Sequence, residues 1–270
     1  MCGTGSPFFS SNVEWNPFFP YICIPVSLMS MEPVLTHIAH SCFLLESPSL
    51  MVVFDYWRDR PDNFLKKCLE QAQVPCYVVA SHFHDDHFNP EIFSWKNGEG
   101  RAPKYLLSYD TVKKRRVPPD VPDAVLRPGI PYETEGFRLL PFRSTDVGIS
   151  TAIELSDGTV FFHAGDLNNW YFPDDPGHMR VSLREMEGLY LSVIHSVKES
   201  FPRIDHLMFP VDPRLGAETL RGAVQLLERI QVRHFYPMHF WGMMDELYSC
   251  LDILSSRFPQ THFHCPSAPF

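Results

Sequence analysis

Short apolar runs alternate with amphipathic stretches from residue 34 onward. Apolar runs bounded by glycine, proline, asparagine or aspartate predict buried strands, and apolar residues that recur with helical spacing predict helices. The pattern predicts helices at 62–73, 182–201, 216–230 and 244–257, with a further helix start near 89–91. It predicts strands at 34–39, 42–47, 51–55, 76–80, 105–107, 136–142, 149–155, 159–164, 207–211 and 233–238.

The predicted strands fall into two groups, which are divided by a proline-rich crossover near residues 118–135. Helices close each group, and no stretch between the groups has the composition of a flexible linker. This order predicts one α/β domain built as a four-layer αβ/βα sandwich, in which two mixed sheets are flanked by helices. Loops from both sheets then lie along one edge, where residues far apart in the sequence can meet.

Residues 1–30 differ from the rest of the chain, because their aromatic residues follow neither a helical nor a strand period. The apolar stretch 20–31 is too short to span a bilayer and is broken by Pro25. A secretion signal needs a basic start, and the first basic residue of the chain is Arg58. We therefore expect 1–30 to be a poorly ordered N-terminal extension, such as an upstream start codon would add, and 31–270 to be the folded domain. An arm that packs its aromatic residues on a neighbour is the alternative.

Composition narrows the class of protein. Of the 270 residues, 44% are hydrophobic and 20% are charged, as in ordinary globular domains. The formal net charge of −9 argues against binding to nucleic acid or to an anionic membrane. The seven cysteines are scattered and form no Cys-x-x-Cys pair, which is typical of a reduced cytoplasmic protein.

Three histidines and two aspartates occur within the segment 81–87, directly after a predicted buried strand. A loop at a strand end can aim several side chains at one point. Neutral imidazole and ionised carboxylate are the usual ligands of zinc and similar divalent ions. Because alternate side chains of an extended segment share a face, His82, His84 and Asp86 can converge, with His87 beside them. The segment predicts a metal site, for which a solvated loop is the alternative.

The string His82-x-His84-x-Asp86-His87 resembles the signature of the metallo-β-lactamase superfamily, whose members are mostly hydrolases. Four other segments resemble landmarks of that family in the same order. Residues 35–45 resemble the opening hairpin of the branch that includes the ascorbate-phosphate lactonases, and residues 51–55 resemble the next strand with its structural aspartate. Residues 160–166 resemble the strand with a metal-bridging aspartate, and residues 234–239 resemble the last strand with its histidine ligand. The resemblance spans residues 32–265 and implies the metallo-β-lactamase fold.

The resemblance implies two divalent metal ions. One ion would be held by His82 and His84, and the other by Asp86, His87 and His239, with Asp166 bridging them.

The chain departs from the family pattern ahead of the bridging aspartate. The family usually supplies a histidine there, but residues 143–150 contain none and offer Asp146 instead. Either Asp146 replaces the imidazole, which we favour, or the first ion is held more weakly by His82 and His84 alone. Zinc is the metal expected first, and a carboxylate ligand would tilt the choice toward manganese or iron.

Two further residues are expected to support the ligands. Asp55 is the candidate to accept a hydrogen bond from a ligating imidazole and so fix its tautomer. His163 lies on a predicted buried strand, and we expect it to be a supporting or core residue rather than a ligand.

Substrate contacts are predicted from position alone. His40 is expected to reach the substrate from the edge of the sheet. Asn168 and Trp170 follow the bridging aspartate, and Trp241 follows the last ligand, so we expect them to line the mouth of the site. Hydrophobic loop packing is the alternative for these aromatic residues.

The function that the resemblance implies is hydrolysis of an ester, lactone or phosphodiester bond in a small molecule by a metal-bound hydroxide. Two ions acidify a shared water, so no nucleophilic side chain is required. Asp86 is the expected catalytic residue, which orients the hydroxide and moves protons. The expected partner is a small-molecule substrate, and assembly into a homo-oligomer is left open.

Two other functions are alternatives. A nuclease or RNA-processing phosphodiesterase of the same superfamily is the first, although the acidic balance of the chain argues against it. A non-catalytic metal-binding module is the second, and it requires that the position of Asp146 leave one metal site empty.

Overall fold

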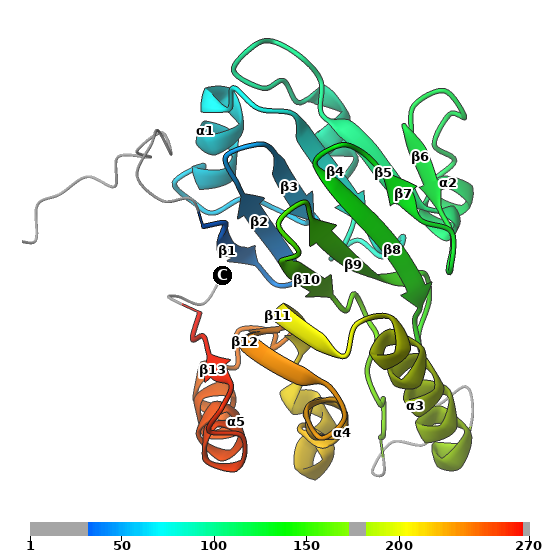
Figure 1. Cartoon of the computed structure of the whole chain (residues 1–270), viewed down its shortest axis with the longest axis vertical. Coiled ribbons are helices and arrows are strands. Elements are labelled where there is room, and N and C mark those ends of the chain that lie inside the picture. The colour runs from blue at the N-terminus through cyan, green and yellow to red at the C-terminus, as the bar shows by residue number, and fades with distance from the viewer. Residues whose placement is uncertain (1–31, 173–181, 267–270) are drawn as a thin grey trace, which may run out of the picture.

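The structure, a computed structural model, describes residues 32–172 and 182–266, so the extension predicted at 1–30 lies outside the described residues. Two sheets form the centre of the fold (Figure 1). The first sheet follows chain order: its first three strands are antiparallel, and its third to sixth strands run parallel. These strands are β1 (Val34–Ala39), β2 (Cys42–Glu46), β3 (Met51–Phe54), β4 (Cys76–Ala80), β5 (Lys104–Ser108) and β6 (Ala124–Leu126).

The second sheet also follows chain order, and its antiparallel half comes first. The parallel half starts where its fourth strand pairs with the fifth. Both sheets are therefore mixed, as the sequence predicts. The strands are β7 (Tyr132–Glu133), β8 (Phe137–Arg143), β9 (Ile149–Leu155), β10 (Val160–His163), β11 (Arg203–Pro210), β12 (Gln231–Met238) and β13 (His262–Phe263).

Helices flank both sheets and complete the predicted four-layer sandwich. Figure 1 shows α1 (Phe64–Gln71) and α2 (Tyr109–Lys114) beside the first sheet, and α3 (Leu183–Ser200), α4 (Arg221–Leu227) and α5 (Met244–Arg257) beside the second. The 3₁₀ segments are η1 (Pro90–Ser94) and η3 (Pro213–Glu218). In the described ranges, no helix combines the length and the apolar character needed to cross a membrane.

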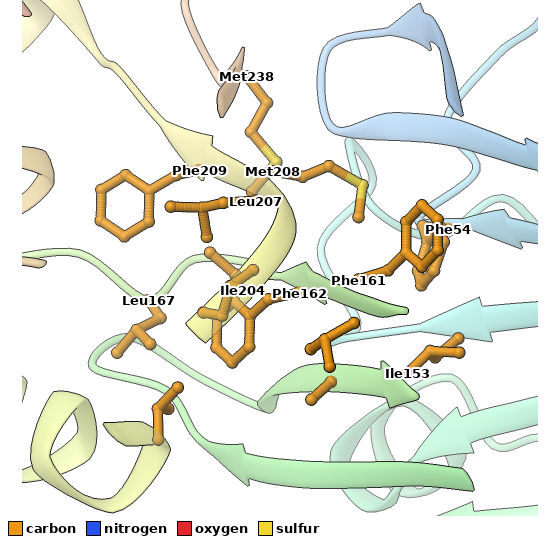
Figure 2. Close-up of a cluster of buried hydrophobic side chains, with 14 of the residues drawn as sticks. Phe54, Ile153, Phe161, Phe162, Leu167, Ile204, Leu207, Met208, Phe209 and Met238 are labelled. Carbon is orange, nitrogen blue, oxygen red and sulfur yellow. The ribbon is translucent and has the colours of Figure 1, made fainter. Parts of the chain in front are cut away.

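The alternation of side chains along the strands produces these layers. Phe54 of β3 belongs to the core that the two sheets share, whereas its neighbour Val53 packs with Leu65 of α1 on the other face. Figure 2 shows the shared core: Met208 of β11 points toward Phe54, and Leu207 points away from it. Buried residues on both faces of each sheet fix the register, because a slip by one residue would exchange the two faces.

The structure differs from the sequence prediction between β11 and β12. The sequence predicts one helix at 216–230, but the chain forms η3 and then the separate helix α4. Gly216 lies inside η3 and has φ 59° and ψ −125°, which is outside the helical region and kinks η3, and the α-helix starts only at Arg221. The pattern also misses β6, β7 and β13, because strands of two or three residues carry too little alternation to detect.

Parallel strands deliver the loops of both sheets to one edge. In open α/β sheets, the carboxyl ends of parallel strands form the usual place for a site. Asp55 directly follows β3 and the segment 81–87 follows β4, while Asp166 comes shortly after β10 and His239 directly after β12. A backbone contact from His239 N to His40 O at 3.5 Å joins the edge of the second sheet to the β1–β2 turn.

Histidines of three adjacent strands lie in register elsewhere on the second sheet. His206 pairs with His234, which pairs with His262, and the ring of His264 stacks on Tyr236 at 4.0 Å. Burial, together with the neighbouring imidazoles, lowers the pKa of His206 and of His264 to about 4.

We expect the free energy of unfolding to fall as the pH is lowered from about 6.5 to about 4. In this window the unfolded chain binds protons at histidines of ordinary pKa, about 6.5, while the folded chain resists protonation, so acid favours unfolding. Urea unfolding at pH 7 and pH 5 measures the loss. His264→Phe keeps a stacked ring without a titratable group and should lose less stability, whereas His195→Phe on the exposed side of α3 is the matched control. Equal losses in H264F and in the unmodified chain would contradict the prediction.

Candidate metal centre

The segment 81–87 leaves β4 as an extended strand end and then turns. The backbone N–H groups of His87 and Phe88 donate to the carbonyl of His84 at 3.1 and 2.9 Å, which curls the second part of the segment. His82 and His84 therefore share a face, as alternation predicts, but Asp86 does not join them. Asp86 and His87 instead face a neighbouring set of residues.

Two glycines allow three segments to meet around Ser81. A Cβ at Gly148 would lie 2.2 Å from the Ser81 carbonyl oxygen, and Gly148 has a positive φ of 71°. A Cβ at Gly165, where φ is 53°, would lie 2.9 Å from the Ser81 side chain. Only glycine tolerates both the contact and the conformation at these positions. The loops that carry Asp146 and Asp166 are thereby brought against the histidine segment.

His82, His84 and Asp166 form what we name the first donor group. Each offers one ligand atom, and these atoms lie within 4.8 Å of one another. His82 Nε2 is 3.0 Å from His84 Nδ1 and 3.4 Å from Asp166 Oδ2. His82 is fully buried, whereas His84 is partly exposed.

His40, Asp86, His87 and His239 form the second donor group under the same 4.8 Å limit. Asp86 Oδ2 lies near the centre of this group, 3.2 Å from His40 Nε2, 3.7 Å from His87 Nε2 and 3.9 Å from His239 Nε2. His40 and His239 both have positive φ angles, 50° and 61°, at the turns that deliver them. The structure thus places His40 among the donors, closer to the centre than the sequence predicts.

Asp166 lies between the two donor groups. Its Oδ2 faces His82 of the first group, while its Oδ1 is 3.1 Å from His87 Nε2 and 3.5 Å from His239 Nε2 of the second. One carboxylate therefore presents one oxygen to each group.

Buried carboxylates hold the imidazoles from behind. Asp55 Oδ2 lies 2.7 Å from His87 Nδ1, and the same carboxylate accepts hydrogen bonds from the Ser81 N–H and hydroxyl at 2.7 and 2.6 Å. Asp212 plays the corresponding part for His239, whose Nδ1 lies 3.0 Å from Asp212 Oδ2. Such partners fix the tautomer and leave Nε2 directed at the centre.

The surroundings of the centre keep its carboxylates anionic. Burial alone would raise the pKa of Asp166, but His87, His82 and His239 outweigh it and hold that pKa well below its usual range. The pKa of Asp86 is also lowered, because His40 and His87 outweigh burial. Burial lowers the pKa of His40 to about 4, so His40 is neutral at pH 7.

These residues fit divalent metal ions. His87 Nε2 and Asp166 Oδ1 are buried and, among the described residues, make no hydrogen bond, although they lie 3.1 Å apart. Burial alone would lower the pKa of His87, but Asp166 and Asp55 raise it well above its ordinary value. The space between His87 Nε2 and Asp166 Oδ1 therefore favours positive charge. A divalent cation ligated by the neutral imidazole and the carboxylate would supply that charge.

Asp146 lies beside the first donor group but outside it. Its Oδ2 is 3.7 Å from His84 Nδ1, and its side chain is 29% exposed. Asp166 is the carboxylate of this group under the 4.8 Å limit, and the role of Asp146 as a ligand stays a prediction.

Of the other residues that the sequence predicts near the site, two lie behind the donor groups and two line a cavity. His163 is in neither donor group but lies behind them: its Nδ1 is 3.8 Å from Asp55 Oδ2, its Nε2 lies 2.8 Å from the Ser41 carbonyl, and its ring stacks on Phe54. Asn168 is also buried and does not line the mouth, because its Oδ1 turns toward the backbone N–H of Asn169. Trp170 and Trp241 do line a cavity of about 700 Å³ over the centre.

Sequence reasoning overlooks two residues that order the centre. Asp212 follows the end of β11, and the pairing of β11 with β12 places it beside His239. The sequence feature that could have indicated Asp212 is its position just after an apolar strand. Arg115 donates to the Phe83 carbonyl at 2.6 Å and pairs with Asp85, which ties α2 to the histidine segment. No local pattern distinguishes Arg115 from its basic neighbours.

Comparisons with known proteins agree with this architecture. Residues 34–174 match the β-lactamase superfamily domain. Igni18, a metallo hydrolase from the archaeon Ignicoccus hospitalis KIN4/I, is similar in structure with a TM-score of 0.60 at 16% identity, over 87% of this chain and 94% of that chain. CmlA, a diiron β-hydroxylase from Streptomyces venezuelae, has a TM-score of 0.58 at 11% identity, over 88% of this chain and 53% of that chain. A search of curated proteins gives no match.

Likeness at such low identity shows the fold alone. The family match carries more, because it spans more than half of the chain and includes the string from His82 to His87 as well as Asp166. The chain therefore belongs to the β-lactamase superfamily and has the metallo-β-lactamase fold.

Proposed function

We propose that the protein is a dinuclear metal-dependent hydrolase that cleaves an ester, lactone or phosphodiester bond in a small molecule. The observation that carries this proposal is the position of Asp166, with one oxygen toward each donor group. A carboxylate shared in this way suits two divalent ions close together.

The two donor groups would each hold one ion. In the first, His82 and His84 would be ligands with Asp146 as an additional carboxylate; in the second, Asp86, His87 and His239 would be ligands with His40 beside them. When bound, the two ions supply an acidified water and polarise the oxygen of the bond that is cleaved.

Three side chains of the protein would position the reacting groups at the centre. Asp86 lines the cavity and is 21% exposed, so its carboxylate can accept a hydrogen bond from a water and orient it. His40 Nε2, 3.2 Å from Asp86 Oδ2, limits the rotation of that carboxylate. Trp170 donates from Nε1 to the Asp166 carbonyl at 2.8 Å, which fixes an apolar ring against the centre and excludes water there.

Metal removal tests the proposal. Dialysis against a chelator should abolish hydrolysis of p-nitrophenyl acetate and bis-p-nitrophenyl phosphate, and added zinc, manganese or iron should restore it. Elemental analysis before and after counts the ions and identifies the preferred metal, with zinc expected first and about two ions per chain if both groups are filled. Unchanged turnover after verified metal removal would exclude metal-dependent hydrolysis.

The same experiment separates the alternatives. A non-catalytic module would bind metal without turnover of either substrate. A nuclease would cleave RNA and bind it more tightly at low salt. Resemblance of residues 35–45 to the lactonase-like branch makes lactones the first substrates to test, and the cysteine usage supports a cytoplasmic location.

Replacement of Asp146 is expected to affect the first ion selectively. Asp146→Ala should weaken one of two bound ions by about tenfold to hundredfold, because a carboxylate beside His84 is lost. Asp146→His should raise the preference for zinc over manganese, since it supplies a third imidazole. Competition with a coloured chelator measures both affinities, and Asp157→Ala, at the turn of the β9–β10 hairpin, is the control. Equal affinities in all three proteins would mean that the first ion is held without residue 146.

A further inference from the structure

The cavity over the metal centre is lined by both polar and apolar side chains. Asp86, Asp166 and His239 form a polar side that belongs to the centre. The apolar part of the lining, which we name the apolar wall, consists of Trp170, Phe172, Met186, Leu189 and Trp241, and the rings of Trp170 and Trp241 lie 5.5 Å from that of His239.

Two residues of the apolar wall are open to solvent, while its Trp170 and Met186 are buried. Leu189 is 50% exposed and Trp241 is 43% exposed, although both are large apolar side chains. Leu189 follows Met186 by three residues on α3, so the apolar face of this helix extends from the core into the cavity. Exposed apolar surface beside a reactive centre is typical of a binding site for an apolar group.

The apolar wall is also preformed. Trp170, Met186 and Leu215 form a buried cluster separate from the main cores, with Phe172 packed against it. The rings of Trp170 and Phe172 are parallel, and the indole N–H of Trp170 is anchored to the Asp166 backbone. A group that lies on these rings is therefore held at a fixed distance from the shared carboxylate.

Charge at the rim does not favour a polyanion. Among the described residues that line the cavity, Arg214 is the one lysine or arginine. Its Nε lies 2.9 and 3.1 Å from the two oxygens of Asp212, and its guanidinium covers the ring of Trp241 at 4.6 Å. Asp212 thus neutralises this cation, and the Arg214 stem adds to the apolar surface.

We infer that the substrate is an ester or lactone whose medium-length acyl or aromatic group lies on the apolar wall. The inference rests on the proposed function, since it names the substrate class of the same site. The cavity volume of about 700 Å³ is within the range of small-molecule sites and leaves room for such a group beside the reacting bond.

A series of p-nitrophenyl esters from acetate to octanoate tests the inference on the metal-loaded protein. The ratio kcat/KM should rise about two- to fourfold for each added methylene, as expected when each one is removed from water. Leu189→Gln should reduce the octanoate-to-acetate ratio by about tenfold, because the wall becomes polar. Ile253→Gln is the matched control, since Ile253 is also an exposed apolar residue of a helix, 57% exposed on α5, and does not line the cavity.

The outcomes separate this inference from the proposed function. Ester hydrolysis that is equally fast at all chain lengths would overturn the inference and leave the function standing. If no ester is cleaved, titration with neutral N-methyloctanamide, followed by tryptophan fluorescence, decides the matter. Binding that L189Q weakens and I253Q does not would support the apolar site, and absence of binding would overturn it.

Discussion

Asp166→Asn is expected to abolish hydrolysis and to strip the protein of most of its metal. The carboxylate faces His82 with one oxygen and His87 and His239 with the other, so one substitution weakens both donor groups. Asparagine has the same shape but offers one neutral oxygen and an amide N–H₂, which cannot ligate a cation. Loss of several kcal/mol of metal-dependent stabilisation of the transition state corresponds to a fall in kcat/KM of roughly 10³-fold or more.

Elemental analysis and ester hydrolysis measure the two effects in the same preparation. Asp157→Asn is the matched control, because Asp157 lies at the turn of the β9–β10 hairpin and accepts a hydrogen bond from the nearby Thr159 N–H. We expect D157N to retain its metal and its activity. If D166N retained two ions and near-normal turnover, Asp166 would not be shared between metal sites, and the observation that carries the proposed function would be lost.

The sequence predicts the fold and most of the centre because both depend on local patterns. Buried strands appear as apolar runs, and the candidate ligands follow directly after strands that the pattern identifies, as His82 follows β4 and His239 follows β12. Chain order then suffices to place both loops at one edge, since the strands that precede them run parallel within each sheet.

The remaining features depend on lateral packing, which the sequence does not display. Asp212 reaches His239 only because β11 and β12 pair in one register. His40 joins the second donor group because its φ is positive. Positive φ is uncommon for residues other than glycine, so the sequence does not predict this turn. Asp86 leaves the face of His82 and His84 because the chain turns after His84, whereas alternation assumes an extended segment.

The second large effect is expected from Asp55→Asn, which should destabilise the metal-free protein by about 3 kcal/mol, or by roughly 6–12 °C in melting temperature. Asp55 is fully buried and accepts hydrogen bonds from the Ser81 N–H and the Ser81 hydroxyl while it also faces His87 Nδ1. These partners need an acceptor, and an amide N–H₂ in place of Oδ2 leaves part of the network unsatisfied. The backbone is not disturbed, because asparagine tolerates the φ of 44° at this position.

The same substitution should weaken metal binding by about tenfold to hundredfold through the tautomer of His87. With an amide N–H₂ opposite Nδ1, the imidazole keeps its proton on Nε2, the atom that points at Asp166 and would have to ligate the metal. Urea unfolding of the metal-free protein isolates the stability effect, and chelator competition measures the affinity. Asp62→Asn is the control, since Asp62 is 51% exposed and only pairs with Arg60 at 3.8 Å. Loss of stability without loss of affinity would make Asp55 a purely structural residue, and loss of neither would remove it from the account of the centre.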